Sequence, residues 1–279
     1  MAISSGLELV PPNRRNPYNT SSHGLGQMIS HLYFSEGVKS IVIGLGGSST
    51  GDAGLSVLYA LDALDFSWKK TPPAYLTGSD ILDLTSVTIK PNQRILDEVC
   101  LQLACDVSTP LLGPNGSAFS FGEQKGLKPK DIPVYENKVM KKAWKLIRGV
   151  RGVDELNTMS FGGCGGGTAS GLYACFKHVE LRSGVNLICE VLNLSSMMSE
   201  VDLVITGEGK YDSMTQNDKV VNKVREIDPS AAVICGVNNT GSTYRVYDLV
   251  SRFGLNESIQ NTKNCVKRVV SEIYYSVNN

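Results

Sequence analysis

The sequence predicts an α/β protein, because short apolar runs alternate with helical spacings and glycine-rich loops join the two. A β-branched run at residues 40–45 lies between helical spacings of apolar residues at 24–36 and 53–64. The loop that follows the run begins with Gly46 and Gly47. Helix, strand, glycine loop and helix in this order are typical of a parallel sheet covered by helices.

The remainder of the chain repeats this alternation. The run at 40–45 suits a buried parallel strand, and further strands are expected at residues 99–107, 201–205 and 231–235. Helices are expected at residues 130–150, 168–176, 185–194 and 264–277. Two segments rich in Pro, Asn, Ser or Thr are expected to be irregular, at residues 1–22 and 67–90.

The bulk composition excludes several classes of protein. The 279 residues are 42% hydrophobic and 19% charged, as is usual for a globular protein of about two domains. Lys plus Arg number 27 and Asp plus Glu also number 27, so no overall field favours nucleic acid or a membrane surface as partner. The apolar runs are shorter than the ~20 residues of a membrane span, and the first residues lack a signal-peptide pattern.

The cysteines indicate a cytoplasmic protein, and the histidines bear on metal binding. Seven cysteines occur without any C-x-x-C pair, which predicts reduced thiols that mostly fill the core. Three histidines far apart in sequence argue against a structural zinc site. The sequence leaves the oligomeric state open, a homodimer included.

Candidate site residues follow the expected strands. Ligands of open α/β sheets bind beyond the carboxyl ends of strands, and glycine lets backbone N–H groups approach an anion closely. The first loop contains Gly46, Gly47, Ser48, Thr50 and Asp52. It fits an anion cradle in which Asp52 is a base or metal ligand, and equally a plain turn with Asp52 near an N-cap. It is not a P-loop, since no Gly-Lys-Ser/Thr ends it.

The later loops allow similar alternatives. Lys125 is either a cation for a phosphate or carboxylate or an exposed surface lysine. The glycine run at 162–167 fits a phosphate nest before a helix, or a hinge. In a loop expected at 206–212, Glu208 and Asp212 beside Lys210 suit metal-assisted phosphoryl transfer, or a solvated loop of compensating charges.

Four long motifs occur in order: IVIGLGGSSTGDAG, ACDVSTPLLGPNGSAFSFGEQKG, GGCGGGTASGL and DLVITGEGKYDSMT. With the opening SGLELVPPNRRNPYNTSSHGLGQMI, they resemble the type I glycerate kinases from about residue 4 to about residue 236. The resemblance implies transfer of the γ-phosphoryl group of ATP to a hydroxyl of D-glycerate, with Mg²⁺. It also implies two dissimilar α/β domains, one of them Rossmann-like with a parallel sheet, and a site in the cleft between them.

The resemblance further implies domain limits and residue roles. Residues 1–195 would be the middle α/β domain of this fold, and residues 196–279 the C-terminal part of the Rossmann-like domain. Catalytic roles are expected for Asp52, Asp212 and Lys125, with either aspartate as proton acceptor, while Gln124 faces the same cleft. Cofactor contacts are expected from Gly46, Gly47, Ser48, Thr50, Gly165, Gly166, Gly207 and Gly209. Metal ligands are expected at Glu208 and Asp106.

The sequence also departs from the family pattern. The family's N-terminal segment is not found, so we expect a truncated or naturally shortened form. Gly51 replaces the Asn that is usual in the family, and Ala53 replaces a Gly. The alanine adds a Cβ where positive φ is expected. Met214, and Asp218 ahead of Lys219, are further departures. They leave open an inactive homologue that binds nucleotide or small acids.

A dinucleotide-binding oxidoreductase is a third hypothesis. Gly44-x-Gly46-Gly47 after a strand suggests it. The full Gly-x-Gly-x-x-Gly spacing fails, and no acidic residue clearly ends a second strand to bind the ribose, so this hypothesis is disfavoured.

Overall fold

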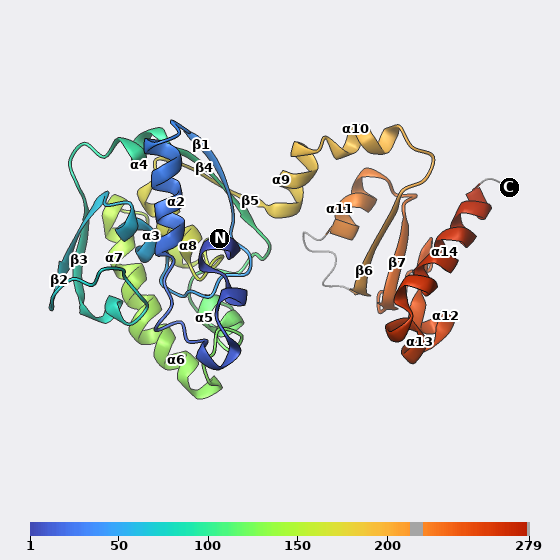
Figure 1. Cartoon of the computed structure of the whole chain (residues 1–279), viewed down its shortest axis with the longest axis horizontal. Coiled ribbons are helices and arrows are strands. Elements are labelled where there is room, and N and C mark those ends of the chain that lie inside the picture. Colours follow the sequence, from blue (N-terminus) through green and yellow to red (C-terminus); the bar gives the residue numbers. More distant parts are fainter. Residues whose placement is uncertain (213–219, 278–279) are drawn as a thin grey trace. The chain divides into compact units, whose positions relative to one another are not determined.

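The computed structural model describes residues 1–212 and 220–277, and it confirms the α/β class with parallel sheets (Figure 1). Met214, Asp218 and Lys219 lie outside the described residues. The chain divides into two compact units, an N-terminal unit Met1–Gly184 and a C-terminal unit Val185–Asn279. The domain limit expected at residue 195 lies further along, inside a helix, and the family assignment of each part remains a prediction.

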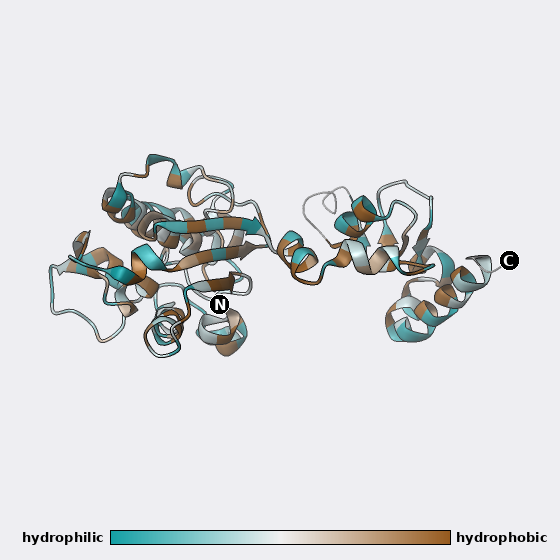
Figure 2. Cartoon of the chain, turned by 90° about the horizontal axis from the view of Figure 1, so that it is seen from above, coloured by the Kyte–Doolittle hydropathy of each residue, from teal (hydrophilic) through white to brown (hydrophobic). Residues whose placement is uncertain are grey.

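The N-terminal unit is built on a three-stranded parallel sheet. Its strand order is β1 (Ser40–Gly44), β4 (Cys100–Cys105) and β5 (His178–Ser183). In Figure 2, which is coloured by hydropathy, strands and helices carry both hydrophobic and hydrophilic residues. β1 and β4 alternate between buried and more exposed residues. Helices therefore bury one face of the sheet. The strand expected at 40–45 is confirmed, but its other face is open, since Val42 is 54% exposed.

Eight α-helices belong to the N-terminal unit within the described residues: α1 (Ala2–Ser5), α2 (His23–Phe34), α3 (Leu55–Ala60), α4 (Arg94–Glu98), α5 (Ser117–Phe121), α6 (Ile132–Tyr135), α7 (Lys141–Arg151) and α8 (Thr168–Cys175). A π-helical turn, Glu136–Met140, joins α6 to α7, so the helix expected at 130–150 is confirmed as one helical run. α2 packs on α3, and α3 packs on α8. Ile29, Leu58 and Leu172 of these helices are fully buried beside Leu103 of β4.

Residues 67–90 are irregular only in part: residues 69–79 contain no helix or strand, but the residues on either side of them do. An antiparallel pair forms there from β2 (Leu64–Trp68) and β3 (Leu84–Ile89), with Phe66 opposite Val87. The two strands carry β-branched and aromatic residues, while the prolines are confined to the connecting loop. β3 also packs against α7, which supplies the tertiary contacts that a lone hairpin needs.

The C-terminal unit has its own parallel sheet and its own core. The strand order is β6 (Ile205–Tyr211), β7 (Ala232–Asn238) and β8 (Val246–Asp248). Its described helices are α9 (Gly184–Val191), α10 (Leu194–Ser199), α11 (Val220–Ile227), α12 (Leu249–Phe253), α13 (Leu255–Gln260) and α14 (Thr262–Val277). The core is small: Ala232, Ile234, Leu249, Cys265, Val269 and Ile273. No helix among the described residues is both long enough and apolar enough to cross a bilayer.

The position expected for the first strand of this unit is wrong. The sequence predicts a strand at 201–205 and then a loop, but β6 begins at Ile205 and includes Gly207, Glu208 and Gly209. A Cβ added to Gly207 would collide with the carbonyl oxygen of Ile234 in β7. Gly207 therefore serves the close approach of two strands, a use that sequence alone does not distinguish from a glycine loop.

Candidate active site

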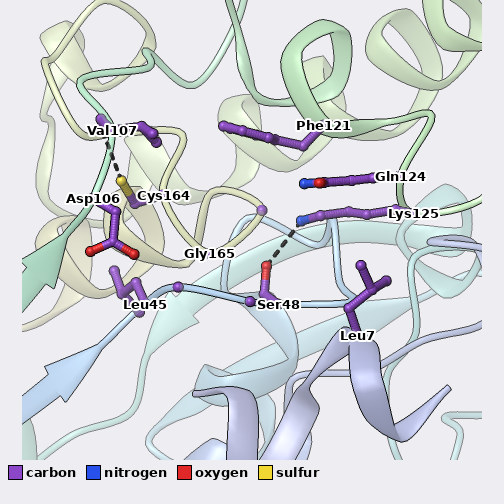
Figure 3. A pocket seen from close by; sticks show the side chains of 13 residues that line it. Leu7, Leu45, Ser48, Asp106, Val107, Phe121, Gln124, Lys125, Cys164 and Gly165 are labelled. Atoms are coloured by element: carbon purple, nitrogen blue, oxygen red, sulfur yellow. Dashed lines mark hydrogen bonds between the residues drawn. The ribbon is translucent and has the colours of Figure 1, made fainter. Parts of the chain in front are cut away.

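An open cavity of about 200 Å³ lies where β1 and β4 end, within the N-terminal unit (Figure 3). This volume is smaller than the ~300–1,000 Å³ that is typical of pockets for drug-sized ligands. Its lining comes from the first loop, from the segments after β4 and α5, from the glycine run and from Leu7. The lining residues are Leu7, Leu45, Gly46, Gly47, Ser48, Asp106, Val107, Phe121, Gln124, Lys125, Cys164, Gly165 and Gly166. The first three loops of the sequence analysis thus meet at one place.

Lys125 provides the positive charge of this cavity. Its side chain is buried, and its ammonium group donates hydrogen bonds to Ser48 Oγ at 2.9 Å and to the Thr50 carbonyl oxygen at 2.6 Å. Burial lowers the pKa of Lys125 to about 8, against an opposing effect of the Asp52 carboxylate, which favours the charged form. The residue is therefore a buried cation and not an exposed surface lysine.

The ammonium group also orients the serine hydroxyl. Because Ser48 Oγ accepts from Lys125, the hydrogen of that hydroxyl is left to donate to another acceptor. Within residues 1–212 and 220–277, the amides of Gly46, Gly47 and Ser48 donate to no backbone carbonyl. The first loop therefore presents several N–H and O–H donors around one buried positive charge, as an anion site requires.

The glycine run completes this wall of the cavity. Gly165, Gly166 and Gly167 all have positive φ, from 64° to 87°, and lead directly into α8. A Cβ on Gly166 would collide with the Thr50 carbonyl oxygen, so the turn packs against the first loop. In the described chain, the amides of Gly165 and Gly166 donate to no backbone carbonyl. This geometry is that of a backbone nest.

Asp106 places a carboxylate in the same cavity, one residue after β4 ends. A Cβ on Gly46 would lie 2.5 Å from Asp106 Oδ2, so only glycine allows the carboxylate to come this close to the first loop. Gln124 also lines the cavity. In the parts of the chain that the structure describes, no three His, Cys, Asp or Glu side chains cluster as a metal site.

Asp52 lies beneath the cavity and does not line it. The residue is fully buried. Its Oδ2 accepts from the Ser22 amide at 3.2 Å and from Ser22 Oγ at 2.7 Å, and its Oδ1 accepts from the Gly54 amide at 3.0 Å. These bonds tie the first loop to the start of α2 and to the turn before α3. The next residue, Ala53, has φ of 51°, the positive φ that the sequence analysis expects at this position.

Two cysteines border the cavity on the side of Asp106. Cys105 Sγ donates to the Leu103 carbonyl oxygen at 3.6 Å. The neighbouring Cys164 thiol and burial raise the pKa of Cys105, and the neighbouring Cys105 thiol lowers the pKa of Cys164. Cys164 Sγ also donates to the Val107 carbonyl oxygen at 3.1 Å (Figure 3). Both residues are almost fully buried.

The remaining predicted site residues belong to the C-terminal unit. Gly207, Glu208 and Gly209 lie in β6, and Asp212 follows that strand directly. The Lys210 ammonium is 3.0 Å from Asp212 Oδ2. The roles predicted for these residues remain predictions, because the cavity described above is formed by the N-terminal unit.

Several supporting residues escaped the sequence reasoning. Ser22 and Leu7 lie in the opening segment that composition classes as irregular. The Tyr135 hydroxyl, fully buried, donates to the Gly51 carbonyl oxygen at 2.6 Å, and burial raises the pKa of Tyr135 well above its usual range. The only available signal was the family-like opening stretch; nothing in the sequence marked Tyr135 within its helix.

Comparison with known proteins identifies the family. A family model described as the glycerate kinase family matches residues 1–278. The chain belongs to the glycerate kinase family. A glycerate kinase of Haemophilus influenzae is 34% identical over 77% of this chain and 56% of its own length. A glycerate 2-kinase of Escherichia coli is 36% identical over 79% of this chain, again over 56% of its own length.

A solved glycerate kinase structure is also similar. The crystal structure of a Salmonella typhimurium LT2 protein assigned as glycerate kinase 2 matches with a TM-score of 0.73 at 30% identity. The match covers all of this chain and 75% of that chain. By contrast, the chain spans little more than half the length of the two glycerate kinases of Haemophilus and Escherichia.

Proposed function

We propose that the protein phosphorylates a hydroxyl group of D-glycerate with ATP as donor. Family membership supports the reaction class, and the main structural observation in its favour is the cavity of the N-terminal unit. There, the buried Lys125 ammonium and the backbone donors of two glycine loops converge. Transfer of a phosphoryl group depends mainly on positioning and on neutralising its oxygens, and both can come from such donors.

Lys125 and Ser48 would bind the anionic groups of the reactants. Glycerate carries a carboxylate and ATP carries phosphates, so both suit a buried positive charge. The amides of Gly46, Gly47, Gly165 and Gly166 would contact the phosphoryl oxygens. Thr50 contributes through its carbonyl oxygen, which holds Lys125 in place. Gly207 and Gly209 are proposed as further cofactor contacts from the C-terminal unit.

Magnesium would enter with the nucleotide. Mg²⁺ is commonly bound through one or two carboxylates and the substrate phosphates. The single Asp106 carboxylate in the cavity fits that donor set, and Glu208 is proposed as a second ligand. The ion would supply charge neutralisation on the phosphate oxygens.

The hydroxyl proton needs an acceptor. Both oxygens of Asp52 already accept hydrogen bonds from Ser22 and Gly54, and the residue is fully buried. We therefore assign Asp52 to positioning the first loop and sustaining the charge of Lys125, and we keep Asp212 as the proposed acceptor.

Glycerate-dependent ADP formation tests this function. We expect turnover that requires Mg²⁺, and a fall in kcat/KM of about 100-fold or more in Lys125→Met, as for loss of a preorganised charged donor. Lys128→Met, at an exposed position three residues away, is the matched control and should leave kcat/KM unchanged.

Two outcomes would contradict the proposal. One is an absence of turnover with any hydroxy acid although ATP raises the melting temperature, which would instead support a ligand-binding homologue without catalysis. The other is a folded Lys125→Met protein with undiminished kcat/KM.

A further inference from the structure

The cavity of the N-terminal unit carries opposite charges at two separate places. Among the described residues that line it, Lys125 is the one cation and Asp106 is the one carboxylate. Figure 3 shows the Asp106 carboxylate on the side of the cavity away from Lys125 and Ser48. A molecule bound in the cavity therefore meets a cation at one end, called here the cationic end, and a carboxylate at the other.

The first loop connects these two ends. Gly46 lies at the carboxylate end, because a Cβ on this residue would be 2.5 Å from Asp106 Oδ2. Ser48 lies at the cationic end, because its Oγ is 2.9 Å from the Lys125 ammonium nitrogen. Two residues of chain span at most about 7 Å. The bridge between the two ends therefore matches the length of a short organic acid and is much shorter than a nucleoside triphosphate.

The cationic end has donors left for one small anion. An ammonium group has three N–H donors, and Lys125 uses two of them for Ser48 Oγ and the Thr50 carbonyl oxygen. The third N–H and the hydroxyl hydrogen of Ser48 are left for a ligand. Two such donors suit the two oxygens of a carboxylate, and the single negative charge of a carboxylate balances the single positive charge of Lys125.

Apolar side chains lie beside the cationic end. Leu7 and Phe121 both line the cavity, and Figure 3 shows both away from Asp106. The Leu7 amide donates to the Gly47 carbonyl oxygen at 2.8 Å. The Lys125 amide donates to the Phe121 carbonyl oxygen at 3.3 Å. Both apolar residues are thus fixed next to the groups that would bind the anion, where less water strengthens an ion pair and limits its screening by salt.

We propose that this cavity is the acceptor subsite, which binds a short hydroxy acid with its carboxylate on Lys125 and Ser48 and its hydroxyl groups facing Asp106. The inference rests on the proposed function and deepens it, because it assigns Lys125 to the acid and not to the nucleotide. All the lining residues belong to the N-terminal unit. The acid should therefore bind in the absence of nucleotide.

Isothermal titration calorimetry of the full chain without nucleotide tests this binding mode. We expect D-glycerate to bind more tightly than propionate, which lacks the hydroxyl groups, and glycerol, which lacks the carboxylate, not to bind. Lys125→Met should weaken glycerate binding about 10- to 100-fold, as for loss of a hydrogen bond to a charged group. The same variant should leave ATP binding unchanged. Lys128→Met, at an exposed position, is the matched control and should change neither.

Two further variants test the ends of the cavity separately. Asp106→Ala should bring the affinities for glycerate and propionate close together, because the hydroxyl groups lose their acceptor. Asp106 is exposed, so this variant should fold. Phe121→Ala should make glycerate binding fall more steeply with added KCl, because water reaches the ion pair. Phe119→Ala is the matched control, since Phe119 belongs to the same helix but is 40% exposed and does not line the cavity.

Two results would overturn the proposal. If Lys125→Met loses ATP binding and keeps glycerate binding, Lys125 belongs to the nucleotide. If the wild-type protein binds glycerate and propionate equally, the hydroxyl groups do not face Asp106. The proposed function fails in a different way: glycerate binding in the expected pattern without any ADP formation would contradict catalysis and support the subsite.

Discussion

Lys125 shows how a single buried charge can organise a site. Its ammonium group holds Ser48 and Thr50 of the first loop, while the Asp52 carboxylate supports its charge from below. The sequence predicted that Lys125, Ser48 and Asp106 would share a site. It could not predict the burial of Asp52, because that depends on Ser22, a residue 30 positions earlier in a segment without recognisable pattern.

The pKa of Lys125 predicts an alkaline limit. Because burial lowers this pKa to about 8, the cation is present below pH 8 and is lost as the pH rises through that value. We expect kcat/KM for glycerate to fall over the same interval in a pH profile. Stability changes in the opposite direction: between pH 8 and 10.5 the unfolded chain holds the proton that the folded chain has lost. From this group alone the free energy of unfolding therefore rises with pH.

Removing the supporting carboxylate should move this limit. In Asp52→Asn the negative charge that raises the pKa of Lys125 is gone. The alkaline limb of the pH profile, where kcat/KM falls, should therefore shift to lower pH. Ser22→Ala removes a hydrogen bond to Asp52 but keeps the charge of the Asp52 carboxylate. This change should cost about 1–3 kcal/mol of stability and should leave the alkaline limb of the pH profile in place. An unmoved limb in Asp52→Asn would show that the carboxylate acts only through packing.

At the scale of elements, the glycine run is a packing device as well as a donor surface. Gly166 combines φ of 70° with contact to the Thr50 carbonyl oxygen, so a side chain there meets both strain and collision. The first loop and the turn before α8 thereby fix each other, as does the hydrogen bond from the Ala53 amide to the Gly166 carbonyl oxygen at 3.0 Å. The shape of the cavity depends on this mutual support.

Gly166→Ala should therefore destabilise the protein. Positive φ and overpacking each cost about 1–3 kcal/mol, so we expect a clear drop in the urea midpoint. Gly149→Ala is the matched control: Gly149 lies inside α7, and a Cβ there meets nothing within 4 Å. That variant should gain about 0.5–1 kcal/mol from helix propensity. Equal midpoints for the two variants would contradict the packing role.

The elements differ in how well the sequence predicts them. β1, β4 and α8 were predictable because apolar periodicity and a glycine loop coincide at each. β5 was missed because its sequence, HVELRS, is polar and half exposed at a sheet edge. β6 was placed too early because its glycines resemble a loop until the neighbouring strand is known. Periodicity thus found elements that bury an apolar face, and failed where pairing with another strand decides the structure.

At the scale of the whole molecule, the two units have separate cores of unequal size. The core of the N-terminal unit includes dozens of buried residues around Leu58 and Leu103, whereas that of the C-terminal unit has six buried members. Less apolar burial predicts lower stability for the C-terminal unit. Both tryptophans, Trp68 and Trp144, belong to the N-terminal unit.

This distribution allows a direct measurement. In urea, we expect far-UV circular dichroism to show two transitions and tryptophan fluorescence to show only the later one, since the fluorescence reports the N-terminal unit alone. Superimposable curves from the two probes would show that the units unfold as one cooperative body.

The reach of Lys125 along the chain has a consequence for biosynthesis. Its contacts with Ser48 and Thr50 span 77 and 75 positions, and the Tyr135 hydroxyl reaches Pro17 across 118. Contacts of such separation form slowly, because a long loop must close before they are gained. The Gly-Gly-Ser loop leaves the ribosome well before Lys125 and Gly166 exist to hold it. Anion binding should therefore appear among the last events of folding, and it could serve as a signal that the N-terminal unit has folded completely.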